Sequence, residues 1–390
     1  MKQQEALRLF SLLNLTWGFW AAPFGFFVSI YLSQSGMSDS MIGLLFGANF
    51  LVAPLVAIPL GMLSDRLNPR KVIIAGMLLT APFYLAITLT DSIALLALFF
   101  VIDAIGANLF SIAADSTMYR HIVSGKSRAF GMIHLLYNVG IGVGLFFSGQ
   151  AIANWGFSGL GTAMLVPALL VILFALKIPG RAIQIEREKL SSYLSDFKRR
   201  EFLLFAVAVF LLAYHWGAEK TSFPLYASNT LLLTSEQLGL LFSLNLFVYA
   251  IAGFLAGRQI AASKDVAKFF MLGLAISALG SFLYAFSYDF GSALLSRILH
   301  DSGDGMLSVS MMLAIAAISG KERTGGTIGA MMIIYALANF TGSVASGYIN
   351  EYFSYSAAIL FSALLTLVSG AVLFLALRLK LSANPFRQPA

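Results

Sequence analysis

The sequence predicts an all-α membrane protein of twelve transmembrane helices. The helices are expected to form two six-helix bundles, related by a pseudo-twofold axis along the membrane normal. Three observations lead to this prediction. The composition is 59 % apolar and 11 % charged, whereas charged residues make up roughly 25 % of soluble domains. Apolar runs of roughly 20 residues, the length that crosses a bilayer, recur along the chain. Segments of the first half also recur in the second half.

The apolar runs follow one another with short polar breaks between them. We expect spans at 9–33, 40–63, 71–89, 93–117, 129–153 and 158–177, and again at 201–227, 236–257, 267–287, 291–317, 327–349 and 355–378. The charged stretch 178–200 separates the two sets and is the predicted linker, with bundles over 1–177 and 201–390. Because Lys2 and Arg8 precede the first run without a small-residue cleavage site, we expect that run to be retained as a span.

The two halves share residues at a nearly constant spacing. Gly43-Leu44-Leu45-Phe46 recurs 196 positions later as Gly239-Leu240-Leu241-Phe242. Further repeated pairs are Trp20 and Trp216, Asn49 and Asn245, Gly61 and Gly257, and Gly149 and Gly347. Since each copy has six spans, both copies have the same orientation in the membrane, and such repeats are typical of transporters with a central cavity.

The basic residues lie at alternate breaks between the spans. Of the 25 Lys and Arg, all but Lys220 and Arg297 fall in the two tails, the linker and every second break, and the other breaks contain none. This is the positive-inside pattern, so we expect both termini and the linker to be cytoplasmic in a plasma (inner) membrane protein. The net charge of +7 therefore indicates topology next to anionic lipid, and we expect no nucleic-acid partner.

The break after the second span contains a recognisable motif, Gly61-x3-Asp65-Arg66-x-Asn68-Pro69-Arg70-Lys71. It resembles the signature loop of the major facilitator superfamily, which reads Gly, three residues, Asp, Arg, any residue, Gly and two basic residues. Two positions differ, because Asn68 replaces the Gly and Pro69 replaces the first basic residue. We expect Asn68 to adopt the left-handed turn conformation that Asn tolerates.

This resemblance covers the whole chain and implies a gating role for the motif. It implies that Asp65 caps the cytoplasmic start of the eleventh span, near Thr324–Thr327, where a helix N-terminus favours a carboxylate. It also implies that Asp115 pairs with Arg66 or Arg70. A solvated turn is the alternative interpretation of these residues.

A few ionisable residues lie inside the predicted spans, where each costs roughly 2.5–3.5 kcal/mol at the helix centre. The tenth span contains Arg297, His300, Asp301 and Asp304 on one helical face. In the seventh span, Glu219 belongs to a polar stripe with His215, Ser222 and Tyr226, and Trp216 and Lys220 lie beside it. Asp103 is in the fourth span. The resemblance implies that the first, fourth, seventh and tenth spans line the cavity, where these charges would converge.

The six charges Asp103, Glu219, Lys220, Arg297, Asp301 and Asp304 comprise two cations and four carboxylates. We therefore expect a carboxylate without a full partner, as proton coupling requires, and name Glu219, Asp301 and Asp304 as candidates. Internal salt bridges that hold the helices together are the alternative.

Other candidate binding residues are aromatic or neutral. Trp20 and Trp216 could stack on a solute or pack against helices, and His134 and Asn339 add polar groups on the fifth and eleventh spans. We expect no metal site, because His300, Asp301 and Asp304 alone offer few ligands. No cofactor is expected.

Enzyme and pump functions lack their motifs. The segment Gly125-Lys126-Ser127 is not a phosphate loop, because Arg120 occupies the position of its first glycine. No HExxH or GxSxG motif occurs. We expect a monomeric secondary transporter, coupled to a proton or other cation, for a small organic solute of amphipathic or zwitterionic character. The alternatives are a drug efflux transporter or lipid flippase of the same fold, and a passive channel without ion coupling.

The gating motif leads to one prediction. Asp65→Asn should slow turnover while leaving the affinity for solute nearly unchanged, because the motif would control the conformational change and not the binding of solute. Transport kinetics in proteoliposomes would measure both parameters. A turnover equal to wild type would favour the solvated-turn interpretation.

Overall fold

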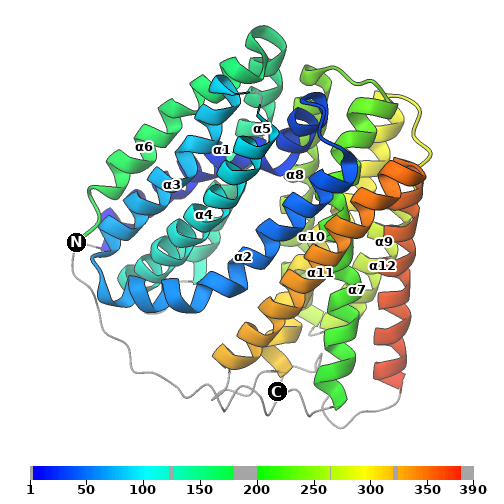
Figure 1. The fold of residues 1–390 in the computed structure, drawn as a ribbon. Coiled ribbons are helices and arrows are strands. Elements are labelled where there is room, and N and C mark those ends of the chain that lie inside the picture. Colours follow the sequence, from blue (N-terminus) through cyan, green and yellow to red (C-terminus); the bar gives the residue numbers. More distant parts are fainter. Residues whose placement is uncertain are drawn as a thin grey trace. The chain divides into compact units, whose positions relative to one another are not determined.

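A computed structural model describes residues 3–90, 92–122, 127–179, 200–263, 265–318 and 324–378 (Figure 1). Within these ranges the chain forms twelve α-helices and one π-helical turn. Eight helical segments of the described part are long and apolar enough to cross a membrane. The chain separates into two compact units, unit 1 (Met1–Met37, Ala48–Glu186, Thr234–Ser243) and unit 2 (Ser38–Gly47, Arg187–Leu233, Leu244–Ala390).

The helices correspond to the predicted spans in number and order. The first half contains α1 (Gln3–Gln34), α2 (Asp39–Arg66), α3 (Pro69–Leu89), α4 (Ile93–Ile122), α5 (Ser127–Ala163) and α6 (Leu165–Ala175). The second half contains α7 (Arg200–Leu225), η2 (Tyr226–Thr230), α8 (Ser235–Ser263), α9 (Val266–Tyr284), α10 (Phe290–Ile318), α11 (Thr324–Tyr352) and α12 (Tyr355–Arg378). The predicted all-α fold with twelve spans is therefore confirmed.

The predicted domain limits remain a prediction. Residues 180–199, which form most of the predicted linker, lie outside the described ranges. The first turns of α2 belong to unit 2 and the first turns of α8 belong to unit 1. Two helices thus contribute to both units. The predicted division into 1–177 and 201–390 assigned each of these helices to one bundle.

Local sequence explains several helix ends. Gly36, with φ 86°, stops α1, because its left-handed conformation lets the Met37 N–H bond the Leu32 carbonyl at 3.1 Å. Before α10, Asp289 accepts the Ser292 N–H at 2.8 Å. The hydrogen bond from the Ser292 hydroxyl, together with this one from the Ser292 N–H, holds the pKa of Asp289 below its usual value.

The structure corrects one expectation about the signature loop. Asn68 has φ −62° and ψ 115°, so it is extended and not left-handed. Its side chain instead accepts the Arg70 N–H at 3.0 Å and caps α3, whose first residue is Pro69. The departures from the family pattern therefore form a helix start, since Asn at the N-cap and Pro at the first position both favour one.

The predicted boundary between the fifth and sixth spans lies at a kink. The element α5 continues to Ala163 but is interrupted at Gly156, where φ is 69°. This conformation suits glycine, which has no Cβ to clash. The predicted span 158–177 therefore comprises the end of α5 after the kink together with α6.

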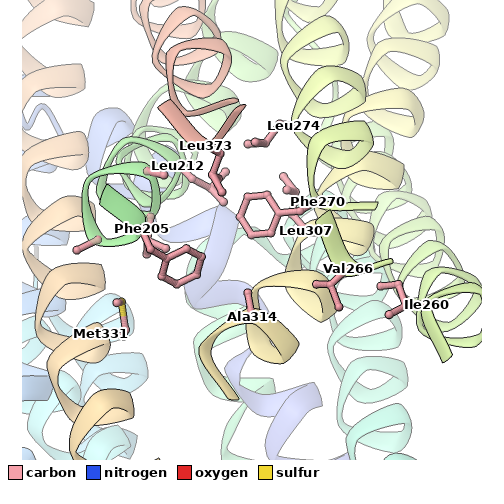
Figure 2. Close-up of a cluster of buried hydrophobic side chains, with 13 residues drawn as sticks. Phe205, Leu212, Ile260, Val266, Phe270, Leu274, Leu307, Ala314, Met331 and Leu373 are labelled. Carbon is pink, nitrogen blue, oxygen red and sulfur yellow. The ribbon is translucent and has the colours of Figure 1, made fainter. Parts of the chain in front are cut away.

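Unit 2 has a core of apolar side chains from six helices. Figure 2 shows Phe270 of α9 between Leu373 of α12 and Leu307 of α10, with Leu212 of α7 beside Leu373. Each of these side chains is at most 2 % exposed. Their packing fixes α7, α9, α10 and α12 against one another. All four helices contribute charged, histidine or serine side chains to the site described below.

Repeated glycines make equivalent close contacts in the two units. In unit 2, a Cβ added to Gly43 would lie 2.9 Å from the Cα of Gly347. In unit 1, a Cβ added to Gly239 would lie 2.9 Å from the Cα of Gly149. These four residues are the two repeated pairs seen in the sequence, so the duplication preserves a contact as well as a pattern. Small residues allow this close helix approach in membranes.

The glycine contacts predict matched effects of substitution. Gly43→Ala and Gly239→Ala should each destabilise the protein by about 1–3 kcal/mol, because the added methyl group meets backbone. Gly257→Ala is the control, since its Cβ would meet only Val309 at an ordinary 3.6 Å. Thermal unfolding in detergent, followed by circular dichroism, measures the difference. Equal melting temperatures for all three variants would contradict the prediction.

Candidate functional site

The ionisable residues singled out in the seventh and tenth spans lie close together inside unit 2. On α7, His215 and Glu219 are one turn apart, and on α10, Arg297, Asp301 and His300 lie on a common face. All five side chains are buried, with at most 8 % of each residue exposed. We refer to these residues together with Asp304 as the polar cluster.

Arg297 is shared by two carboxylates. Its Nη2 donates to Glu219 Oε1 at 2.5 Å and to Asp301 Oδ1 at 3.0 Å. Among the described residues, Arg297 Nε and Nη1 and Asp301 Oδ2 have no hydrogen-bond partner. One guanidinium edge therefore serves two acids, while its other donors and one acid oxygen remain unused.

Two aromatic rings hold the arginine in place. Phe223 and Tyr284 stack with their centroids 5.1 Å apart. The Arg297 guanidinium carbon lies 4.8 Å from the Phe223 ring centroid and 5.8 Å from that of Tyr284. A cation over aromatic faces gains attraction from the ring quadrupoles, which offsets part of its desolvation.

His300 has a defined orientation. Its Nδ1 lies 3.0 Å from the Ser277 carbonyl oxygen, which only accepts hydrogen bonds, so Nδ1 has the proton that it donates there. Its Nε2 lies 3.2 Å from His215 Nε2. The same nitrogen is 3.7 Å from Asp304 Oδ2 and 3.9 Å from Glu219 Oε1.

Polar groups around the cluster orient its other members. The His215 Nδ1 lies 2.6 Å from the Ser362 hydroxyl. Asp304 accepts two hydrogen bonds, both of 2.6 Å, from the Ser277 hydroxyl and from the Trp216 indole N–H. Both of its oxygens face donors, an arrangement that suits an ionised carboxylate.

Glycines bring α9 close enough to supply these serines. A Cβ on Gly280 would overlap the backbone of His300, and a Cβ on Gly303 would overlap the backbone of Ser277. The close approach places Ser277 and Ser281 against His300 Nδ1, with the Ser281 hydroxyl at 3.0 Å. Sequence reasoning missed Ser277, Ser281 and Ser362, although the spacing of Gly273, Ser277, Gly280 and Ser281 marks a small polar face on the ninth span.

The cluster has an excess of acid. Glu219 and Asp301 share one guanidinium, and Asp304 is bonded by the neutral Ser277 and Trp216. Lys220 lies next to Glu219 on α7, partly buried. The two histidines can add positive charge only by taking up protons. The site can therefore hold additional protons or a cation, and His215, Glu219, His300 and Asp304 each offer a ligand atom within 4.8 Å of the others.

Other predicted site residues belong to unit 1. Trp20, in unit 1, is 2 % exposed and stacks on Trp17 at 5.1 Å, so its contacts are those of a packed residue. Asp103, also in unit 1, is 3 % exposed, and its Oδ1 has no partner among the described residues. The convergence of Asp103 with the polar cluster stays a prediction. His134 is exposed on α5.

Asn339 lies in unit 2 near the cluster's tryptophan. It is buried and donates to the Tyr335 carbonyl at 2.8 Å, and its Oδ1 has no partner within the described part of the chain. The Tyr335 and Trp216 rings are 5.6 Å apart. Asn339 and Trp216 thus both contact Tyr335, and their role in binding a solute stays a prediction.

Most residues of the predicted gating motif have side chains that the structure does not describe. They are Gly61, Asp65 and Arg66, together with residues 324–327 of the eleventh span. Arg70 Nε donates to the Ile178 carbonyl at 2.8 Å, and Asp115 is exposed on α4. The pairing of Asp115 with a basic residue of the motif therefore stays a prediction.

The shared arginine leads to a stability prediction. Arg297→Met should destabilise the protein by about 3–5 kcal/mol, because removing one member of a buried ion pair leaves buried charge behind. The control is Arg258→Met on α8, an exposed arginine whose guanidinium lies 5.9 Å from the Phe254 ring and whose loss should cost about 0.5–1 kcal/mol. Thermal unfolding in detergent distinguishes them, and similar melting temperatures for both variants would contradict the prediction.

Comparisons with known proteins identify the family. The chain is 25 % identical over 331 residues to the chloramphenicol resistance protein CraA of Acinetobacter baumannii, covering 81 % of this chain and 76 % of that protein. It is 24 % identical over 368 residues to the MFS-type transporter MJ1560 of Methanocaldococcus jannaschii, covering 89 % and 92 %.

Solved structures show the same fold. A point mutant of the nucleoside transporter NupG superposes with a TM-score of 0.79 at 14 % identity, covering 97 % of this chain and 100 % of that one. An inward-facing, occupied bacterial homolog of the human lysosomal transporter Spinster gives 0.80 at 16 % identity, with both chains covered entirely. The family model of the Major Facilitator Superfamily matches residues 9–228 and 208–389. This chain belongs to the Major Facilitator Superfamily, and it is a multi-pass membrane transporter and not an enzyme.

Proposed function

We propose that this protein is a secondary transporter that moves a small organic solute by alternating access and couples the movement to protons at the polar cluster. The observation that supports coupling is the sharing of one Arg297 nitrogen by Glu219 and Asp301. Two buried acids compete for one cation, so protonation of either acid releases the arginine to the other.

This competition gives a transport cycle its two states. With both carboxylates ionised, Arg297 bridges α7 and α10 through Glu219 while also bonding Asp301 within α10. Protonation of Glu219 weakens the bridge between the helices, whereas protonation of Asp301 leaves it intact. A proton can thus change the strength of an interhelical contact, which a conformational step requires.

The solute class follows from the surroundings of the cluster. Acids and a cation lie beside Trp216, Tyr335 and Phe223, which suits an amphipathic or zwitterionic molecule. The name of the Acinetobacter relative makes chloramphenicol the first solute to test, and that relative supports drug efflux as the second candidate function. A proteoliposome assay with labelled chloramphenicol, with and without a pH gradient, tests both.

The same assay separates the remaining alternatives. A passive channel would give flux that does not saturate and no accumulation against a gradient. A lipid flippase would not transport chloramphenicol and would move labelled lipid between leaflets. We place the termini in the cytoplasm, on the strength of the basic breaks in the sequence, and treat the monomer as the working unit.

The coupling proposal predicts a split between two activities. Glu219→Gln and Asp301→Asn should abolish accumulation driven by a pH gradient while retaining solute exchange, because exchange returns a loaded carrier without net proton movement. Glu236→Gln, an exposed acid at the start of α8, is the control and should behave as wild type. Driven accumulation at wild-type levels in both cluster variants would refute the coupling role.

A further inference from the structure

We propose that His215, Glu219, His300 and Asp304 form a binding site for a divalent first-row transition cation, with Zn²⁺ as the reference ion. This inference goes beyond the proposed transport function. It rests on the geometry of four side chains from α7 and α10, whose ligand atoms all lie within 4.8 Å of one another. From the tenth span alone the sequence offers too few ligands, and α7 supplies the two that complete the set.

The distances suit tetrahedral coordination. Two ligand atoms at about 2.0–2.1 Å from a tetrahedral Zn²⁺ lie about 3.3 Å apart. The two histidine Nε2 atoms are 3.2 Å apart. His300 Nε2 is 3.7 Å from Asp304 Oδ2 and 3.9 Å from Glu219 Oε1. All six pairs of ligand atoms lie within 4.8 Å, so rotation of the side chains that shortens the widest separations by up to about 1.5 Å would bring four ligands onto one ion.

The outer contacts orient the ligands as metal sites require. Both histidines direct Nε2 inward, because Nδ1 of His300 is held by the Ser277 carbonyl and Nδ1 of His215 by the Ser362 hydroxyl. The Ser277 hydroxyl also donates to Asp304 Oδ1, and the Trp216 indole N–H donates to Oδ2. Oδ2 still has a second lone pair that can bind the metal. Metal-ligating histidines ordinarily have such partners on the other ring nitrogen.

Charge and ligand type select the ion. Two carboxylates balance a divalent cation, and Arg297 keeps a partner in Asp301 when Glu219 turns to the metal. Imidazole with carboxylate suits Zn²⁺, Co²⁺, Ni²⁺ or Cu²⁺, whereas Ca²⁺ and Mg²⁺ prefer sites made of oxygens. The proton of the Nε2 to Nε2 hydrogen bond would move to His215 Nδ1, which then donates to the Ser362 hydroxyl, so that both Nε2 lone pairs can face the metal.

Direct binding to purified, tag-free protein in detergent tests the site without any transport measurement. Calorimetric titration with Zn²⁺ should give one ion per chain, and Co²⁺ should give the intense visible bands of a tetrahedral complex.

Variants assign the binding to these residues. His300→Ala and Asp304→Asn should each weaken Zn²⁺ at least about 10-fold, and Ser362→Ala, which acts through His215, about 10- to 100-fold. His134→Ala removes an exposed histidine of unit 1 and should bind as wild type. Glu236→Gln removes an exposed acid at the start of α8 and should also bind as wild type.

Two results would overturn the proposal. One is the absence of stoichiometric Zn²⁺ binding to the wild-type protein. The other is equal affinity in His300→Ala and His134→Ala, which would place any bound ion elsewhere. His300→Gln, which keeps the size and polarity of the side chain, and a single size-exclusion peak for each variant show that weaker binding reflects a lost ligand and not misfolding.

Discussion

The ion pair between Arg297 on α10 and Glu219 on α7 is the constraint on which the rest of unit 2 depends. A charge at the centre of a membrane span costs roughly 2.5–3.5 kcal/mol, and here a guanidinium and three carboxylates are buried together. They are tolerated because each finds an opposite charge or a hydrogen-bond donor, and because the guanidinium also lies against the stacked rings of Phe223 and Tyr284. Helix placement must therefore be accurate, since a buried ion that loses its partner destabilises the fold far more than a surface ion does.

That accuracy comes from residues without charge. Gly280 and Gly303 let α9 approach α10 until the Ser277 carbonyl and hydroxyl reach His300 and Asp304. The apolar core around Phe270 keeps the helices at this separation. The polar groups are thus positioned by close backbone contacts at the glycines and by packing of the apolar core. Small and apolar residues therefore determine which hydrogen bonds the charged residues can form.

The sequence predicted the helices well and the contacts between them less well. Twelve spans and their order followed from apolar runs, because burial in lipid demands continuous apolar stretches of fixed length. The face shared by Arg297, His300, Asp301 and Asp304 followed from helical spacing. The partners on other helices could not be predicted, because nothing in the spacing of Ser277 or Ser362 says which side chain they meet. The fine structure at Asn68 also escaped prediction, since a cap and a left-handed turn use the same residue type.

The indole of Trp216, bonded to Asp304, gives the protein a natural optical probe. The chain has four tryptophans, and Trp17, Trp20 and Trp155 belong to unit 1, so Trp216 is the one that unit 2 contains. Its emission arises directly beside a carboxylate of the cluster and should respond to any change in the charge of that group. Substituting the other three with Phe would leave a chain whose tryptophan fluorescence, excited selectively over that of its 14 tyrosines, reports on this region alone with no label attached.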